Sequence, residues 1–246
     1  IGWAWDSARN KFWMIPGYQS DASSYCPGVA MTMGKMATFN PNTAVWTDEQ
    51  TRNMSLGAGE GKSFMNYNSV TDKFYRLTGA ITREIYDPKT DSWSMKNFNT
   101  PNAQVGWEYS ALDVAGQVIY VISWVDGHLY RYNIGLDTLT DLGAVPASAL
   151  PLRVNSQYPV WDSINNVLLW PRITTFGYED GNPDSQRITL YVYHPNTATW
   201  QIDAMYAPDG YSVRGNSAVF DPLQNVLMVM GQRSLAPNGK LFLYRY

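Results

Sequence analysis

The chain has 246 residues, of which 45% are hydrophobic, 14% aromatic and 16% charged, and its formal net charge is −3. This composition is unlike that of a disordered segment, and it lacks the basic excess typical of nucleic-acid-binding domains. The longest apolar runs, at 118–125 and 226–230, are far shorter than the roughly 20 residues of a membrane-spanning helix, so we expect a soluble chain with no membrane span.

The first predicted element is a β-hairpin in the sequence WAWDSARNKFWMI, which starts at Trp3. Two runs rich in aromatic and β-branched residues flank a short turn of Asp, Ser and Asn type, which is typical of a hairpin. The same pattern starts again at Met65, Ser110, Pro159 and Ala218. Its spacing of about fifty residues indicates an internal repeat. The acidic or amide residues that precede the five turns, here called the anchors, are Asp6, Asn68, Asp113, Asp162 and Asp221.

A third predicted strand follows each hairpin, and a fourth strand follows after another short turn in all repeats except the last. The third strands read MATFN, REIYD, LYRYN, LYVYH and LFLYRY. The fourth strands are marked by Trp46, Trp93, Leu139 and Trp200. Four short antiparallel strands per repeat are typical of a β-propeller blade, and we expect the Trp residues to pack within the blades.

We therefore predict an all-β fold: a single β-propeller domain with five blades, of which the last lacks its outer strand. The alternative is a β-sandwich with irregular hairpins. The predicted blades span residues 1–56, 57–104, 105–150, 151–210 and 211–246.

The repeat resembles that of the kelch family of β-propellers, which carries a Tyr and a Trp around its third and fourth strands. The Trp falls six residues after a polar residue in NPNTAVW, DPKTDSW and HPNTATW, and the resemblance covers nearly the whole chain. The paired glycine that kelch repeats carry after the second strand is missing. The corresponding positions read PGY at 16, TGA at 78, VDG at 125, PRI at 171 and MGQ at 230.

The resemblance also implies that one blade combines strands from both ends of the chain. Here the chain starts directly on a first strand and ends after a third strand, so the outer strand of the last blade has no donor. We expect residues outside this chain to supply it, or the edge to be open or covered by a partner, because unpaired edge strands readily pair. The first residue is Ile1, so we expect a processed product or a fragment of a longer chain.

The predicted connections differ strongly between the two faces of the propeller. The turns from strand one to two and from strand three to four are short, as in DSARN and NPNT. The opposite face receives long segments at 16–35, 47–62, 143–157 and 172–188. Long loops gathered on one side of a rigid scaffold tend to carry function. We therefore predict that this face binds a partner.

The predicted binding residues are aromatic and charged side chains of that face. Aromatic rings stack on sugars or anchor protein interfaces, although the same rings also pack within their own loops. The set consists of Tyr18, Tyr25, Trp107, Glu108, Arg153, Phe176, Tyr178, Tyr211 and Arg214.

The sequence does not predict a catalytic set. The positions five residues before the anchors, expected near the mouth of the central channel, hold Ile1, Ser63, Glu108, Gln157 and Asn216. Glu108 is the sole carboxylate among them, whereas glycoside hydrolysis normally needs two. Glu108 is therefore the candidate acid of an alternative function, that of a secreted carbohydrate-active enzyme.

No metal or cofactor site is predicted. The lone Cys26 excludes an internal disulfide and a cluster of thiolate ligands. Copper-radical oxidases share the kelch scaffold and need two His, two Tyr and a Cys linked to one Tyr. The chain offers Cys26, His128 and a Tyr193–His194 pair. The two His residues are expected at opposite ends of strands, where they cannot share a metal, so we predict both to be ordinary turn residues.

These observations favour a non-catalytic interaction module without a cofactor. We expect its loop-bearing face to bind protein subunits of an assembly or a glycan, and we expect no nucleic-acid partner. A low Lys content and many Asn and Tyr residues suit an extracellular protein or a virion surface. A structural role in such an assembly is therefore one version of this hypothesis.

Overall fold

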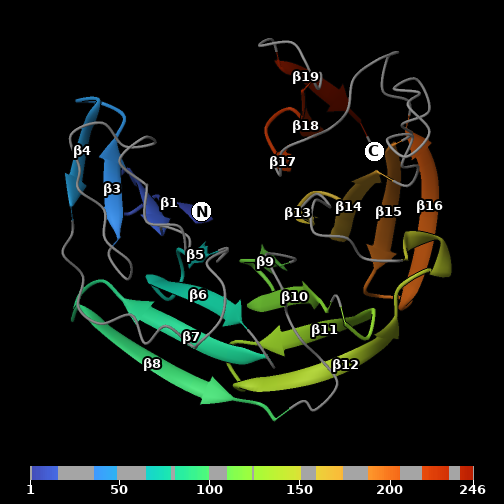
Figure 1. Cartoon of the computed structure of the whole chain (residues 1–246), viewed down its shortest axis with the longest axis horizontal. Coiled ribbons are helices and arrows are strands. Elements are labelled where there is room, and N and C mark those ends of the chain that lie inside the picture. The colour runs from blue at the N-terminus through green and yellow to red at the C-terminus, as the bar shows by residue number, and fades with distance from the viewer. Residues whose placement is uncertain are drawn as a thin grey trace. The chain divides into compact units, whose positions relative to one another are not determined.

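The computed structural model describes residues 2–15, 36–48, 65–78, 81–99, 110–123, 125–150, 159–173, 188–205, 218–232 and 239–245. In these ranges the regular structure consists of β-strands and the short 3-10 helix η2, Ala147–Ala149 (Figure 1). No helix in these ranges has the length and apolar character needed to cross a membrane.

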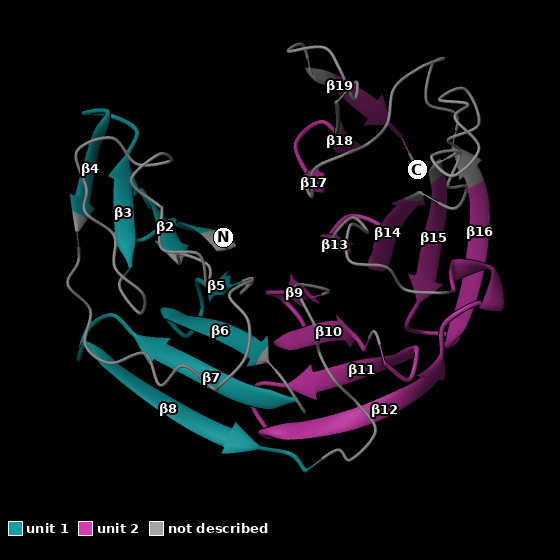
Figure 2. Cartoon of the chain, in the orientation of Figure 1, with its two compact units in different colours: residues 1–108 teal, residues 109–246 magenta. Residues whose placement is uncertain are grey.

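The chain divides into two compact units, residues 1–108 and 109–246 (Figure 2). Unit 1 holds blades 1 and 2. Blade 1 consists of β1 Gly2–Asp6, β2 Lys11–Ile15, β3 Ala37–Asn40 and β4 Val45–Asp48, and blade 2 of β5 Asn66–Asn68, β6 Lys73–Thr78, β7 Thr82–Asp87 and β8 Ser92–Asn97.

Unit 2 holds the other three blades. Blade 3 consists of β9 Ser110–Asp113, β10 Val118–Ile122, β11 His128–Asn133 and β12 Thr138–Ala144. Blade 4 consists of β13 Val160–Asp162, β14 Val167–Ile173, β15 Ile188–His194 and β16 Thr199–Met205. Blade 5 consists of β17 Ala218–Asp221, β18 Val226–Gln232 and β19 Gly239–Tyr244.

Every blade is an antiparallel sheet whose strands follow one another in sequence order. The predicted fold is confirmed: the chain is an all-β, five-bladed β-propeller whose last blade has three strands in the described residues. The β-sandwich alternative is therefore wrong. Whether the five blades act as a single domain stays a prediction.

The anchors occupy the same place in every blade, the last residue of the first strand. The side-chain oxygen of Asp162, for example, accepts hydrogen bonds from the amides of Ile164 and Asn165, both over 2.9 Å. Asp6, Asn68, Asp113 and Asp221 cap their turns through the same kind of bond. These bonds hold the amides of the turn and explain why Asp or Asn precedes it.

The hairpin turns also share one backbone conformation. In every hairpin that the structure describes, four turn residues separate the strands and the last of them has a positive φ. This left-handed conformation suits Asn and Asp better than most residues. The residues concerned are Asn10, Ala44, Asp72, Asp91, Gln117, Asp137, Asn166, Ala198 and Asn225, with φ from 49° to 54°.

The recurrent aromatic residues lie side by side across the strands. Tyr86 pairs with Trp93 across β7 and β8, and Tyr193 pairs with Trp200 across β15 and β16. The ring centroids lie 5.0 Å and 5.1 Å apart, respectively. Phe39 and Trp46 form the equivalent pair of blade 1. As predicted, the Trp of the fourth strand packs within its own blade, where aromatic cross-strand pairs stabilise a sheet.

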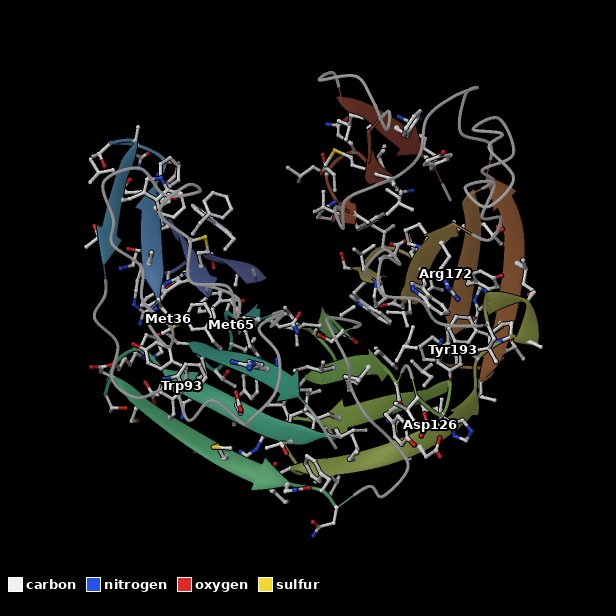
Figure 3. All side chains as sticks on the ribbon, viewed as in Figure 1. Met36, Met65, Trp93, Asp126, Arg172 and Tyr193 are labelled. Atoms are coloured by element: carbon white, nitrogen blue, oxygen red, sulfur yellow. The ribbon has the colours of Figure 1, made fainter. Side chains whose placement is uncertain are left out.

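The hydrophobic core consists of layers between neighbouring blades of one unit. In unit 1, Ala4 and Trp13 of blade 1 pack with Phe74 and Tyr86 of blade 2. Met36 and Met65, labelled in Figure 3, belong to the same core. In unit 2, one core joins blades 3 and 4 and another joins blades 4 and 5. Burying each large apolar side chain contributes about 1.5–3 kcal/mol, so these layers hold neighbouring blades of a unit together.

Candidate functional site

The predicted binding residues all fall outside the described residues, so each stays a prediction. The same holds for the predicted channel-mouth positions, including Glu108, and for Cys26. The residues concerned are Tyr18, Tyr25, Trp107, Glu108, Arg153, Phe176, Tyr178, Tyr211 and Arg214.

The described strands show where the segments that carry these residues are attached. Residues 16–35 connect β2 to β3, 174–187 connect β14 to β15, and 206–217 connect β16 to β17. Because successive strands of a blade run in opposite directions, these connections leave the end of the blade opposite the hairpin turns. We call that end of a blade the loop end and the other the turn end.

Blade 3 has a short loop end that the structure describes almost completely. There the amide of Ser123 donates to the carbonyl of His128 over 2.9 Å, and the amide of Gly127 donates to the carbonyl of Ser123 over 3.1 Å. Gly127 has a φ of +69°, a conformation that favours glycine. Its carbonyl accepts a bond from the amide of Val145, 2.8 Å away. The start of β11 is thereby tied to the segment after β12.

A polar cluster lies at this loop end (Asp126 is labelled in Figure 3). Tyr130 donates its hydroxyl proton to Asp126 Oδ2 over 2.7 Å, and His128 Nδ1 lies 2.9 Å from Asp141 Oδ2. Burial and the bond to Asp126 raise the pKa of Tyr130. Burial acts against ionisation of Asp141, but the Gly143 amide and the His128 ring outweigh it and lower the pKa of that carboxyl.

This cluster offers a partner a partly exposed imidazole and an exposed carboxylate, those of His128 and Asp141. In the part of the chain that the structure describes, no three His, Cys, Asp or Glu side chains are grouped to hold a metal ion. The prediction that His128 is a turn residue is wrong. His128 starts β11, where its amide donates to Asp126 Oδ1. His194 ends β15 before a turn, so the two histidines stand at opposite ends of third strands, as predicted.

Two buried charged side chains, which the sequence did not predict, lie close to the loop end of blade 2. Arg76 of β6 and Glu84 of β7 are cross-strand partners, with Nε 3.4 Å from Oε2 and side chains only 6% and 3% exposed. Burial lowers the pKa of Arg76, and the charge of Glu84 opposes this shift. The sequence did contain a signal for this pair. Arg76 lies two residues after Phe74 and Glu84 two residues before Tyr86, so both charged residues occupy core-facing positions of their strands.

A second buried guanidinium lies near the end of β14 in blade 4. Arg172 is labelled in Figure 3. Its guanidinium carbon lies 5.0 Å from the ring centre of Trp170, a cation–π contact. The charged side chain of Arg172 is buried, although Arg172 is the second-last residue of β14 and the segment 174–187 follows that strand. In blade 4, the strand that leads into a predicted binding segment therefore contains a polar group that is costly to bury.

The turn end of unit 1 carries an ionic network that connects two blades. Arg9 of blade 1 donates to both carboxylate oxygens of Asp72 in blade 2, over 2.8 Å and 3.0 Å. Tyr67 donates to Asp72 Oδ1 over 2.8 Å, and Lys89 Nζ lies 3.1 Å from Oδ2. Such bidentate bonds are the strong kind of charged hydrogen bond. The bonds of Arg9, with further contributions from Tyr67 and Lys89, outweigh burial and hold the pKa of Asp72 well below its usual range.

Replacing Asp72 by Asn is expected to lower the free energy of unfolding at pH 7 by about 1–2 kcal/mol. A carboxyl whose pKa is lower in the folded chain than in the unfolded chain stabilises the fold fully above the unfolded value, near 3.9. This stabilisation is lost progressively as the pH falls from there through the lower pKa of the folded chain. The loss should therefore shrink between about pH 5 and pH 3, as measured by urea unfolding at each pH. Tyr67→Phe, which keeps the Arg9 bonds, is the control and should retain the pH dependence. An equal loss at pH 7 and pH 3 would contradict the prediction.

Comparisons with known proteins agree with the fold described above. No protein-family model and no curated protein sequence matches the chain. Among solved structures, a chain of the nidogen/laminin complex aligns with a TM-score of 0.55 and 12% identity, over 87% of this chain and 75% of that chain. TolB from Acinetobacter baumannii aligns with a TM-score of 0.59 and 11% identity. A chain of the mitotic checkpoint complex aligns with a TM-score of 0.51 and 10% identity.

These similarities extend over most of this chain, but they leave a large part of two of the neighbours uncovered. The alignments cover 100% of this chain for TolB and 97% for the mitotic checkpoint complex, but only 51% and 61% of those two chains. At such low identity the likeness shows the fold alone, a β-propeller.

Proposed function

We propose that this chain is a non-catalytic binding module that presents the segments at the loop ends of its blades to a protein or glycan partner. The observation that carries the proposal is the asymmetry between the turn ends of the blades and the loop ends of blades 1 and 4. The turn ends close in four-residue turns. The segments at 16–35, 174–187 and 206–217 join the strands at the loop ends. Long connections on a rigid sheet scaffold are where binding residues tend to lie.

The solved propellers to which the chain is similar support a protein partner. Two of them come from complexes of several proteins, the nidogen/laminin complex and the mitotic checkpoint complex. We also propose that the propeller is kelch-like and acts as a single domain, which binds its partners through one face. We extend the proposal to an extracellular or virion-surface assembly, which the Asn- and Tyr-rich composition favours.

The proposed contacts are made by the aromatic residues of the loop ends, with Tyr18 and Tyr178 as the first positions to test. Replacing each by a photo-cross-linking amino acid in extracts of the native source should give the same discrete cross-linked product from both. Leu136 and Leu223 are matched controls, because both are exposed residues of turn ends. Products from the controls but not from positions 18 and 178 would overturn the proposal.

The alternative of a carbohydrate-active enzyme is separated from binding by Glu108→Gln. Both forms are incubated with a panel of glycans, and turnover and binding are measured. Glycan hydrolysis that is lost in Glu108→Gln while binding is kept would identify an enzyme. The binding module predicts no turnover by either form.

A further inference from the structure

The loop end of blade 3 exposes two aliphatic side chains that adjoin the same turn. Val125 belongs to the turn between β10 and β11 and is 50% exposed, and Leu150, which follows η2, is 46% exposed. A Cβ at Gly127 would lie 3.1 Å from Leu150 Cδ2, so the side chain of Leu150 rests against the turn that carries Val125. Adjoining exposed apolar side chains with a polar rim are typical of interaction sites, whereas single ones are ordinary.

The segment that ends at Leu150 is fixed to the fold, so the exposure of this side chain does not come from a loose loop. Val145 and Ala149 of the same segment are buried in the core that joins blades 3 and 4. The hydroxyl of Tyr191 in blade 4 donates to Ser148 Oγ over 3.3 Å. A surface that is already ordered binds a partner at a lower entropic cost.

Charge indicates the chemistry of the partner. Asp126 follows Val125 in the sequence, and Asp141 Oδ2 lies 2.9 Å from His128 Nδ1. Burial, the hydrogen bond to Asp126 and the charges of Asp126 and Asp141 together raise the pKa of Tyr130, so both carboxylates lie near its hydroxyl. Among the described residues, neither carboxylate has a Lys or Arg nitrogen within 4.0 Å. The apolar pair therefore has an acidic rim.

A β-bulge sets the position of the Asp141 carboxylate. His128 is paired with Ala144 and Tyr130 with Asp141, so β12 has one extra residue between these two pairs. Gly143 lies in the bulge with a φ of +95°, and its amide donates to Asp141 Oδ1 over 2.8 Å. Bulges redirect side chains at sheet edges. The side chain of Asp141 remains 47% exposed, and a carboxylate with these bonds can still accept a further donor.

We propose that the blade 3 patch, made of Val125, Asp126, His128, Asp141 and Leu150, binds a partner protein through a large apolar side chain next to an Arg. The apolar side chain covers Val125 and Leu150, and the guanidinium pairs with Asp141, where Asp126 adds negative charge. Arg suits this patch better than Lys because its flat group can also stack on the partly exposed ring of His128. This inference rests on the proposed function, since it names the chemistry of the partner at one loop end.

The chain itself supplies a competing occupant. Arg153 follows Leu150 by three residues, so a guanidinium of this chain is close to the patch in the sequence. If Arg153 paired with the carboxylates, it would exclude the Arg of a partner. The variant Arg153→Gln is therefore part of the experiment.

The probe is the peptide acetyl-Leu-Arg-Leu-amide, and its binding to the isotope-labelled chain is followed by NMR. Saturable shift changes are expected at amides within residues 125–128 and 143–150. Replacing the peptide Arg by citrulline, which has a similar shape without the charge, should weaken binding about fivefold. Replacing both peptide Leu residues by Ser should abolish binding, because it removes the apolar contact.

Variants of the protein locate the contact. Leu150→Ser should weaken binding of the Arg peptide about fivefold. Asp141→Asn should have the same effect on the Arg peptide but none on the citrulline peptide, because the two changes remove the same contact. Ile202→Ser, at an exposed position, and Asp203→Asn are the matched controls on β16 and should leave binding unchanged.

Two results would contradict the proposal. Equal binding of the Arg and citrulline peptides, or no saturable binding by a protein with an intact unfolding transition, would overturn it. Binding seen only with Arg153→Gln would mean that the chain's own segment 151–158 occupies the patch, which would overturn the choice of a partner protein.

The outcome is distinguishable from that of the proposed function. Loss of peptide binding with the cross-linked products at Tyr18 and Tyr178 intact would refute the blade 3 patch alone. Peptide binding without those products would refute the contacts proposed for blades 1 and 4 alone.

Discussion

Replacing Glu84 by Ala is expected to lower the free energy of unfolding by about 3–5 kcal/mol, because it leaves the guanidinium of Arg76 charged and buried. The two side chains are 6% and 3% exposed, and the carboxylate is the acidic group within 4.0 Å of that guanidinium in the described residues. Arg76 Nε and Nη1 make no hydrogen bond there, and the charge of Glu84 is what opposes the effect of burial on the guanidinium. Urea unfolding followed by tryptophan fluorescence measures the difference.

The double variant Arg76→Met/Glu84→Leu is the matched control. Replacing a buried ion pair by apolar residues of similar size is often neutral or stabilising by about 1–4 kcal/mol, so this variant should unfold at a urea concentration at least as high as the unchanged chain. The Nε–Oε2 distance of 3.4 Å favours this outcome. At this distance of 3.4 Å the ion pair stabilises the fold less than a short charged hydrogen bond would. A cost below about 1 kcal/mol for Glu84→Ala would contradict the prediction.

The fold was predictable because its determinants are local and repeated. An Asp or Asn at the end of each first strand caps a turn within two or three residues, as Asp162 and Asp221 do. The cross-strand pair Tyr193–Trp200 follows from the length of the turn between its strands. Both features are set by short-range geometry, so they recur in the sequence at a fixed spacing. The three-stranded last blade was predicted from the same pattern.

The charged contacts were not predictable in this way because they depend on register or on packing between blades. Arg76 faces Glu84 only once the pairing of β6 with β7 is known. Arg9 reaches Asp72 from the turn of a neighbouring blade, 63 residues away in the sequence. No spacing within a repeat encodes that distance. The predicted binding residues, such as Tyr18 and Tyr178, lie on long connections, where turn chemistry and strand periodicity give no constraint on conformation.

Asp6→Ala is expected to cost about 3–4 kcal/mol, far more than the same change at the anchor Asp221. The fully buried carboxylate of Asp6 accepts bonds from the amides of Ala8 and Arg9, both over 3.0 Å, and from Arg9 Nη1 over 2.9 Å. It also accepts a bond from the indole Nε1 of Trp13, 3.0 Å away in the core. Removing the carboxylate loses a turn cap and leaves a buried donor unsatisfied, which adds about 1–3 kcal/mol to the cost.

Asp221→Ala is the control that isolates the part due to Trp13. Asp221 caps the amides of Leu223 and Gln224 in the equivalent turn, but its bonds are exposed to solvent, so its loss should cost only about 1 kcal/mol. The stability loss of Asp6→Asn should lie between those of Asp6→Ala and Asp221→Ala. The amide oxygen of Asn can still cap the turn, but its NH₂ group is a donor and cannot accept the hydrogen bond of the Trp13 indole. The order in urea unfolding is therefore Asp6→Ala least stable, then Asp6→Asn, then Asp221→Ala. Equal losses at positions 6 and 221 would mean that the anchor stabilises the fold through its turn alone and that the bond to Trp13 contributes nothing.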